Sequence, residues 1–308
     1  MRGSTKLLIA IIISTTLFSI NAKAQTGVTF LNIPEDAYSL SMGGTTIATG
    51  ANSFSFFSNT SAAVFSKNDI SAGISYGQWC PNASDNTIIN FGTIIKISPK
   101  FSISAGYKNF GYKNITTYDS LGIPDDEITP KEMSSGLGVA YKISNKLSIG
   151  FNANYISSDY IYEKSTTISF GLSGTYIINN LNIGISASNI GRKIKYYNNS
   201  YNLPSLIKAG GQYTFNLGKN SLSTNIESDY LLYENTISGG IGAEFSYKNF
   251  IEFRAGYHLA DKEKTIPSYS SIGLGANIKH INLNLAYILA DNNSAVDKSF
   301  NVSIEILF

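Results

Sequence analysis

The sequence predicts an all-β protein, a transmembrane antiparallel up-and-down β-barrel of about 14 strands with an N-terminal hatch segment. Apolar and polar residues alternate in one segment after another from Asp69 to the end of the chain, and strand side chains point to opposite faces with a period of two. Only 14% of the 308 residues are charged, whereas 27 are glycine and 20 are tyrosine. This composition suits membrane strands with aromatic residues at both interfaces.

The first 24 residues are predicted to be a signal peptide. Two basic residues precede an apolar run at residues 7–20, and Ala22-Lys23-Ala24 places small residues where a signal peptidase cuts. We therefore expect cleavage before Gln25 and export of the chain. No cysteine follows the run, which argues against a lipid anchor, and no later apolar run reaches the roughly 18 residues of a transmembrane helix.

Residues 25–68 are predicted to form the hatch, in the mouth of the barrel. They lack sustained alternation and contain two short turns rich in small residues, Ser41-Met42-Gly43-Gly44 and Asn59-Thr60-Ser61. The candidate hatch residues are Met42, Gly43, Gly44 and Asn59. The glycine pair is a weak signal for phosphate binding, because no strand–GxxxxGK–helix pattern surrounds it.

Residues 69–308 are predicted to form the barrel. The alternating segments are 69–79, 86–97, 100–112, 131–143, 146–160, 165–178, 180–190, 203–217, 220–233, 234–247, 249–260, 268–279, 280–290 and 298–308. Tight turns follow the even-numbered segments, and several longer loops follow the odd-numbered ones. Because outer-membrane barrels have short periplasmic turns and longer external loops, both the hatch and Phe308 are expected on the periplasmic side, with Phe308 closing the barrel.

Charge supports the barrel independently. The charged residues on the polar faces of the segments are Lys96, Lys108, Lys142, Lys208, Glu227, Asp229, Glu244, Glu252, Arg254 and Glu305. A cation facing lipid near the bilayer midplane costs about 2–4 kcal/mol, so a bilayer enforces this segregation. We expect a lumen charge cluster of Lys108, Glu252, Arg254 and His258, with Glu252 and Arg254 as an ion pair. A large soluble β-protein is the less favoured alternative.

The sequence offers no catalytic or metal-binding pattern. The single cysteine, Cys80, has no histidine near it in sequence, and the chain contains only His258 and His280, whereas a catalytic thiol needs an adjacent base. We therefore expect no enzyme activity, no cofactor and no metal. The net charge of +2 gives no reason to expect nucleic acid as a partner.

Several short motifs, in order, resemble those of one family of exported barrels. They are Phe30-Leu31-Asn32-Ile33-Pro34, Ser41-Met42-Gly43-Gly44, Pro130-Lys131-Glu132, Tyr155-Ile156-Ser157-Ser158-Asp159, Ser188-Asn189-Ile190-Gly191, Leu203-Pro204, Phe253-Arg254-Ala255-Gly256-Tyr257 and Gly273-Leu274-Gly275. The chain resembles the PorV/PorQ family of FadL-type outer-membrane barrels of Bacteroidota, and its PorV-like branch more than its PorQ-like branch. It departs from the family's Asn-Pro-Ala in the hatch, where it has Asn59-Thr60-Ser61.

The resemblance implies a role in type IX secretion at the cell outer membrane. PorV-like barrels bind secreted cargo proteins by their C-terminal signal domains and pass them to a surface attachment complex with a sortase, in association with the translocon. On this reading the long loop 113–130 is the candidate partner-binding site, with Tyr118, Asp119, Leu121, Ile123, Asp125, Asp126 and Glu127. Apolar and acidic groups together could dock a β-domain, and a solvated loop that binds calcium loosely is the alternative.

Other partners and roles follow from the same resemblance. The barrel is expected to contact outer-membrane lipid and lipopolysaccharide, whose phosphates Arg192, Lys193 and Lys195 of loop 191–202 could bind; a plain interface belt is an equal alternative. The competing function is a FadL-type transporter of hydrophobic small molecules, with phenylalanines of the hatch around an apolar pocket. An enzyme that acts on lipid A is a third, less favoured reading.

Overall fold

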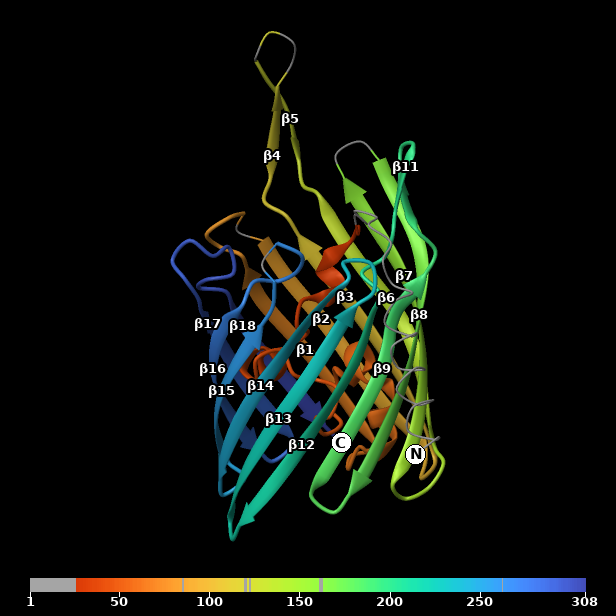
Figure 1. Ribbon diagram of the computed structural model, residues 1–308, viewed down its shortest axis with the longest axis vertical. Coiled ribbons are helices and arrows are strands. Elements are labelled where there is room, and N and C mark those ends of the chain that lie inside the picture. The colour runs from red at the N-terminus through yellow and green to blue at the C-terminus, as the bar shows by residue number, and fades with distance from the viewer. Residues whose placement is uncertain (1–25, 85, 119–120, 122, 161–162, 262) are drawn as a thin grey trace, which may run out of the picture.

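Fourteen strands form a closed antiparallel barrel in the computed structural model (Figure 1). The structure describes residues 26–84, 86–118, 121, 123–160, 163–261 and 263–308. The barrel strands are β1 (Ile70–Trp79), β2 (Asn86–Ser98), β3 (Phe101–Gly111), β6 (Lys131–Lys142), β7 (Leu147–Tyr160), β8 (Glu163–Ile178), β9 (Leu181–Gly191), β12 (Leu206–Leu217), β13 (Asn220–Leu231), β14 (Thr236–Tyr247), β15 (Ile251–Leu259), β16 (Tyr269–Ile278), β17 (Ile281–Leu289) and β18 (Phe300–Leu307). Each pairs with its neighbours in chain order, and β18 pairs with β1 to close the ring. The predicted fold is confirmed, and the strand ends lie within a few residues of the predicted ones.

The two ends of the barrel differ, and we call them the turn end and the loop end. At the turn end, tight turns join strands such as β12 and β13, and Asn179, Gly218, Lys248 and Lys279 adopt the left-handed backbone that short hairpin turns require. The longer connections lie at the other end, which is uppermost in Figure 1. By the general rule for outer-membrane barrels, the loop end faces the cell exterior.

Two connections at the loop end carry strands of their own. β4 (Ile115–Tyr118) pairs with β5 (Pro124–Ile128), and β10 (Ile194–Tyr196) pairs with β11 (Asn199–Tyr201). The sequence predicts loops for both stretches, and that part of the prediction is wrong. A hairpin that stands in water satisfies its backbone by pairing but need not present one apolar face, so the alternation that revealed the barrel strands is weak there.

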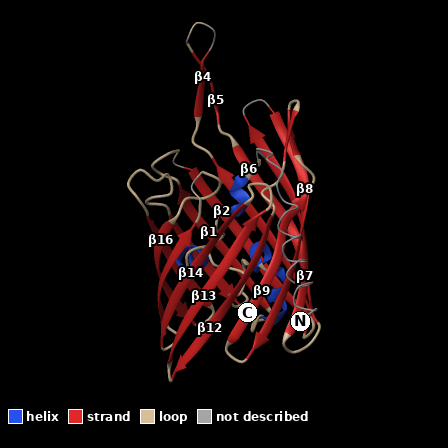
Figure 2. Ribbon diagram, viewed as in Figure 1, coloured by secondary structure: helices blue, strands red, loops and turns tan. Residues whose placement is uncertain are grey.

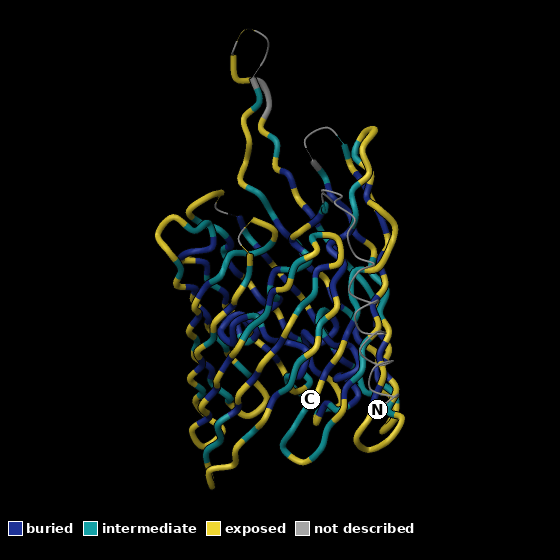
Figure 3. Tube along the Cα trace, in the orientation of Figure 1, coloured by how far each residue is buried: buried dark blue, intermediate teal, exposed yellow. Residues whose placement is uncertain are grey.

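The barrel wall has an apolar outer face and a polar inner face. Ile226 on β13 and Ile241 on β14 are paired in register, and they are 64% and 56% exposed on the outside. Along each strand such residues alternate with buried ones, as the striped tube in Figure 3 shows. The outward side chains are those that hydrocarbon would cover.

The N-terminal segment fills the interior of the barrel. It contains η1 (Thr29–Asn32), α2 (Ala37–Ser41), α3 (Ser55–Ser58) and η2 (Thr60–Phe65), and Figure 2 shows these helices enclosed by the strands. Thr26 forms a bridge with Asn202 at the loop end, and Lys96 near the turn end donates to the Ser66 carbonyl at 2.8 Å. Residues 26–68 therefore run through the whole lumen. They are not confined to one mouth, as the sequence analysis expected.

Glycines in the wall let this lumenal segment (residues 26–68) approach closely. A Cβ on Gly256 of β15 would overlap the backbone of Met42 and Gly43, and one on Gly184 of β9 would overlap Ile47. Only a residue without a side chain permits such contact between a strand and another backbone. No helix in the described part of the chain is both long and apolar enough to cross a membrane.

Candidate functional site

Carboxylates of the wall hold the backbone of the lumenal segment. Glu227 of β13 accepts hydrogen bonds from the backbone nitrogens of Thr46 (2.6 Å) and Ile47 (2.7 Å). Glu305 of β18 accepts from the backbone nitrogen and the hydroxyl of Ser53, both at 2.7 Å. Hydrogen bonds to an ionised group are stronger than neutral ones, so these contacts anchor the segment at two separate places on the ring.

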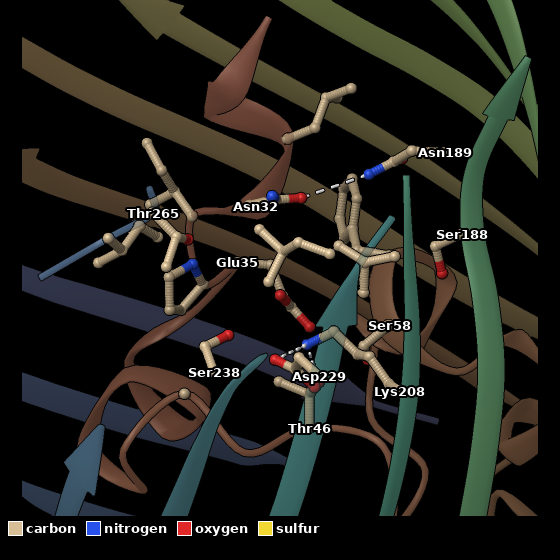
Figure 4. Close-up of a pocket in the computed structure, with 18 of the residues that line it drawn as sticks. Asn32, Glu35, Thr46, Ser58, Ser188, Asn189, Lys208, Asp229, Ser238 and Thr265 are labelled. Atoms are coloured by element: carbon tan, nitrogen blue, oxygen red, sulfur yellow. Dashed lines mark hydrogen bonds and ion pairs between the residues drawn. The ribbon is translucent and has the colours of Figure 1, made fainter. Parts of the chain in front are cut away.

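A buried ionic group surrounds the first of these anchors. The Lys208 ammonium of β12 lies 2.8 Å from Glu227 and 3.5 Å from Asp229, both on β13. The register of the two strands pairs Lys208 directly with Asp229. Figure 4 shows Lys208 and Asp229 pointing toward each other beside Thr46. The cation thus compensates two carboxylates that would be costly to bury alone.

This group forms one wall of a small polar cavity. The cavity has a volume of about 70 Å³ and lies between residues 31–35 of the lumenal segment and the neighbouring strands β9, β12, β13, β14 and β15 (Figure 4). Glu35 and His258 line it, and the Nε2 atom of His258 is buried without a hydrogen-bond partner. A cavity of this size and polarity suits a few water molecules.

A second ionic group lies on the other side of β14. The Arg254 guanidinium of β15 forms ion pairs with Glu252 and, at 2.7 Å, with Glu244 of β14, and it donates to Asn284 at 2.8 Å. It also lies over the ring of Tyr38 from α2, with 4.5 Å from the Arg254 Cζ atom to the ring centroid. The structure therefore pairs Glu252 with Arg254 as expected, and the pair contacts the lumenal segment.

The four residues predicted as one lumen charge cluster do not form one group. Lys108 on β3 donates to the Ile33 carbonyl at 2.8 Å, and five strands separate β3 from β15 along the shorter way round the ring, namely β2, β1, β18, β17 and β16. His258 stacks on Tyr269 with 5.0 Å between ring centroids. The polar face was identified from sequence, but the position of each strand around the ring decides which charges meet.

The residues proposed for the hatch all lie in the lumen against the wall. Met42 is fully buried, and Gly43 and Gly44 have φ angles of +70° and +78°. A Cβ on Gly43 would stand 2.7 Å from the Ile241 carbonyl, so both the backbone angle and the space require glycine. Asn59 donates to the Thr175 hydroxyl of β8 at 2.9 Å.

The residues proposed for partner binding belong to the β4–β5 hairpin, which extends beyond the rest of the loop end in Figure 1. Leu121 and Ile123 are 80% and 56% exposed. Glu127 is also exposed and accepts a hydrogen bond from Asn114 at 3.4 Å. Asp119 lies outside the described residues, as do the side chains of Tyr118, Asp125 and Asp126.

The last residue lies at the seam where the barrel closes. The Phe308 nitrogen donates to the Ile70 carbonyl at 2.8 Å, and its carbonyl accepts from Asp69 at 2.9 Å. The side chain is 69% exposed on the outside. Among the described residues, no three of the types histidine, cysteine, aspartate and glutamate stand close enough to hold a metal ion.

The sequence analysis named the charges on the polar faces but missed how they combine. A tight turn at Gly218-Lys219 fixes the pairing of its two strands, so the Lys208–Asp229 contact could have been read from it. The contact of Glu305 with Ser53 had no such signal, because it joins segments far apart in the chain.

Comparisons with known proteins agree with this architecture. The family model of the type IX secretion system protein PorV matches residues 19–237. The toluene transporter TbuX of Ralstonia pickettii is similar in structure, with a TM-score of 0.64 and 14% identity over 90% of this chain and 99% of that one. The toluene transporter TodX of Pseudomonas putida gives 0.63 and 13% over 89% and 98%, and a Pseudomonas aeruginosa FadL homologue gives 0.53 and 11% over 92% and 98%.

At these identities the structural likeness shows a shared fold, that of the FadL-like outer-membrane barrels. No curated protein matches the sequence. The family match covers most of the chain, including the lumenal segment and the strands from β1 to the start of β14. Together with the closed barrel it places the protein in the outer membrane, and the chain belongs to the family of the type IX secretion system protein PorV.

Proposed function

We propose that this barrel is a non-enzymatic receptor of the type IX secretion pathway. It binds secreted cargo by the C-terminal signal domain and passes it, with the translocon, to the surface attachment complex that contains a sortase. The family match over residues 19–237 carries this proposal. The architecture is consistent with it, because the lumen is occupied by residues 26–68 while the loop end presents projecting hairpins.

The β4–β5 hairpin is the proposed docking element. It projects past the neighbouring connections (Figure 1) and exposes Leu121 and Ile123. Exposed apolar side chains can act as anchors in a protein interface. A hairpin held by its own backbone pairing also loses less conformational freedom on binding than an unstructured loop would lose.

Transport of a hydrophobic molecule through the lumen remains the alternative function, because the structurally similar barrels include toluene transporters. The lumen of this chain does not favour that alternative. The lumenal cavity of about 70 Å³ is bordered by Glu35, Lys208 and Asp229, and a smaller one of about 20 Å³ by Lys108. An apolar ligand there would take these groups out of contact with water without offering them hydrogen bonds.

The test is affinity purification of the tagged barrel from native outer membranes, followed by mass spectrometry. We expect secreted proteins with C-terminal signal domains, a sortase or the large translocon barrel to co-purify with the wild type. The double variant Leu121→Asp with Ile123→Asp should lose them. Tyr233→Asp is the matched control, since Tyr233 is exposed on a different loop of the same end.

Two results would reject the proposal. One is recovery of the barrel without any of these proteins. The other is a wild type that carries long-chain lipid or hydrocarbon in its lumen, which would promote the transporter. Equal recovery of partners by the double variant and the control would support the secretion role but would show that the β4–β5 hairpin is not the docking element.

A further inference from the structure

A second cavity opens at the loop end, beside the β10–β11 hairpin, and its chemistry differs from that of the lumenal cavity. It has a volume of about 480 Å³ and lies between the hairpin, the strands β6 and β8, and residues 26–29 of the lumenal segment. Tyr112, Tyr196, Tyr197 and Tyr201 line it, together with the carboxylates of Glu132 and Glu163. The aromatic rings and the acids thus come from four separate parts of the chain.

The tyrosines form walls that are held in place. The rings of Tyr196 and Tyr201 lie side by side on the hairpin, tilted by 59°, with 5.8 Å between centroids. A Cβ on Gly27 would stand 3.3 Å from Tyr201 and 3.7 Å from Tyr196, so the lumenal segment packs against both. Tyr112 is positioned by its hydroxyl, which donates to Glu132 at 2.9 Å.

Glu132 is buried in this cavity as an acceptor on both oxygens. It is 3% exposed, and it accepts hydrogen bonds from the Tyr112 hydroxyl at 2.9 Å and the Ser158 hydroxyl at 3.0 Å. Glu163 accepts from the Tyr197 backbone nitrogen at 2.5 Å. Both hydroxyls can donate to an ionised carboxylate. Within the described part of the chain, neither glutamate has an ion-pair partner.

The basic residues near the cavity point away from it. Lys131 and Lys164 are exposed, and each adjoins one of the two glutamates in sequence, so the alternation of a strand places it on the opposite, outward face. Lys195 is likewise exposed between Ile194 and Tyr196, which face inward. The sheet therefore separates the charges, with cations outside and uncompensated acids inside.

From this geometry we infer that the cavity binds the side chain of a lysine or arginine presented by a polypeptide at the loop end. Aromatic faces attract a cation through the negative charge above each ring. The two carboxylates would neutralise a bound cation, and no described residue of the chain forms an ion pair with either of them. The aliphatic stem of such a side chain would pack on the tyrosine rings while its charged head reaches the carboxylates. The inference does not depend on the role in secretion, since it concerns a site of the isolated barrel.

The experiment compares two probes on the purified full-length barrel in detergent micelles. Nα-acetyl-lysine methylamide carries the ammonium group, and Nα-acetyl-norleucine methylamide has a similar aliphatic chain without it. Saturation-transfer difference NMR, titrated with each probe, gives the dissociation constants. We expect the lysine probe to bind and the norleucine probe to bind at least about tenfold more weakly.

Variants of the two glutamates test whether the lysine probe binds in this cavity. Glu132→Gln and Glu163→Gln should each weaken the lysine probe about tenfold, and the norleucine probe should be unaffected. Glu263→Gln is the matched control, because Glu263 lies in a separate cavity at the same end of the barrel. Migration in unheated gels, where a folded barrel runs ahead of the unfolded chain, verifies that each variant is folded.

Three outcomes overturn the inference. Equal binding of the two probes would mean that the cavity accepts apolar chains without regard to charge. Unchanged binding by both glutamine variants would mean that the lysine probe binds elsewhere. Glu132-dependent binding of phosphatidylethanolamine vesicles, with no binding of the lysine probe, would assign the cavity to a lipid amine and not to a polypeptide.

Discussion

Glu305 and Ser53 join the last strand of the barrel to the middle of the lumenal segment. The carboxylate takes both the backbone nitrogen and the hydroxyl of Ser53, each at 2.7 Å. Glu305 stands on β18, which pairs with β1 to close the ring. The strand that closes the barrel therefore also holds the lumenal segment in place.

Removing this carboxylate should loosen the segment and lower stability. We expect Glu305→Ala to reduce the free energy of unfolding by about 3 kcal/mol, because the two hydrogen bonds from Ser53 and a third from Asn282 of β17 lose their charged acceptor. Glu305→Gln, which keeps an acceptor, should cost less. The midpoint of urea unfolding can be followed by the fluorescence of Trp79, the single tryptophan, which belongs to the same hydrophobic cluster as Phe30 of the lumenal segment. An unchanged midpoint for the alanine variant would show that the contact does not anchor the segment.

The ionic group of Lys208, Glu227 and Asp229 predicts that a triple variant is more stable than the single variant Lys208→Met. Lys208→Met leaves Glu227 and Asp229 buried without their cation, and breaking a buried ion pair on one side costs about 3–5 kcal/mol. Adding Glu227→Gln and Asp229→Asn to the same chain should recover part of that loss, because the uncompensated charges disappear. The same urea titration measures both variants. If the triple variant is less stable than Lys208→Met, the carboxylates have compensation other than Lys208.

The close approach at Gly256 predicts that this position tolerates no side chain. Gly256→Ala places a methyl group against the backbone of Met42 and Gly43, and overpacking of this kind costs about 1–3 kcal/mol. The control is Gly174→Ala on β8, where the nearest atom would stand at an ordinary 3.6 Å. The yield of folded barrel in detergent and its unfolding midpoint should fall for the first variant only. Equal behaviour of the two would mean that the lumenal segment shifts readily.

Cys80 predicts a pH dependence that comes from burial. It lies in the connection after β1, and burial raises the pKa of its thiol from an ordinary 9.0 to about 11. Since only the thiolate is alkylated, the rate of reaction with iodoacetamide should be low at pH 8 and reach half its maximum near pH 11. In the urea-unfolded chain the rate should reach half its maximum near pH 9. A folded-state profile with its midpoint near pH 9 would contradict the burial.

The raised pKa of Cys80 also decides in which direction the stability of the fold changes with pH. The unfolded thiol loses its proton at a lower pH than the folded one, so the folded state binds the proton more tightly. The contribution of Cys80 is therefore fully present below pH 9 and is lost as pH rises toward about 11. Cys80→Ser removes this component and serves as the reference chain.

The sequence predicted the barrel well because the membrane acts on each strand separately. Lipid on one side and a polar lumen on the other impose a period of two, and β17 and β18 show it as clearly as any other strand. The β4–β5 and β10–β11 hairpins stand in water, where nothing imposes that pattern.

The arrangement within the lumen could be predicted only in part. Lys108 and Arg254 were both correctly assigned to the polar face, yet β3 and β15 lie far apart around the ring. Contacts such as Ser53 with Glu305 join residues 252 positions apart, and short irregular helices carry no repeating pattern that would set their path through the lumen. The glycines that permit the close approach became informative only once their neighbours were known.

Because residues 26–68 pass through the lumen, the chain crosses from one side of the barrel to the other an odd number of times. Fourteen strands alone would leave the two ends of a barrel on the same side of the membrane, but one additional passage through the interior makes fifteen crossings. Thr26 and Phe308 accordingly lie on opposite sides. An epitope inserted just before Thr26 would be displayed on intact cells, whereas the same epitope after Phe308 would be reached only from the periplasm.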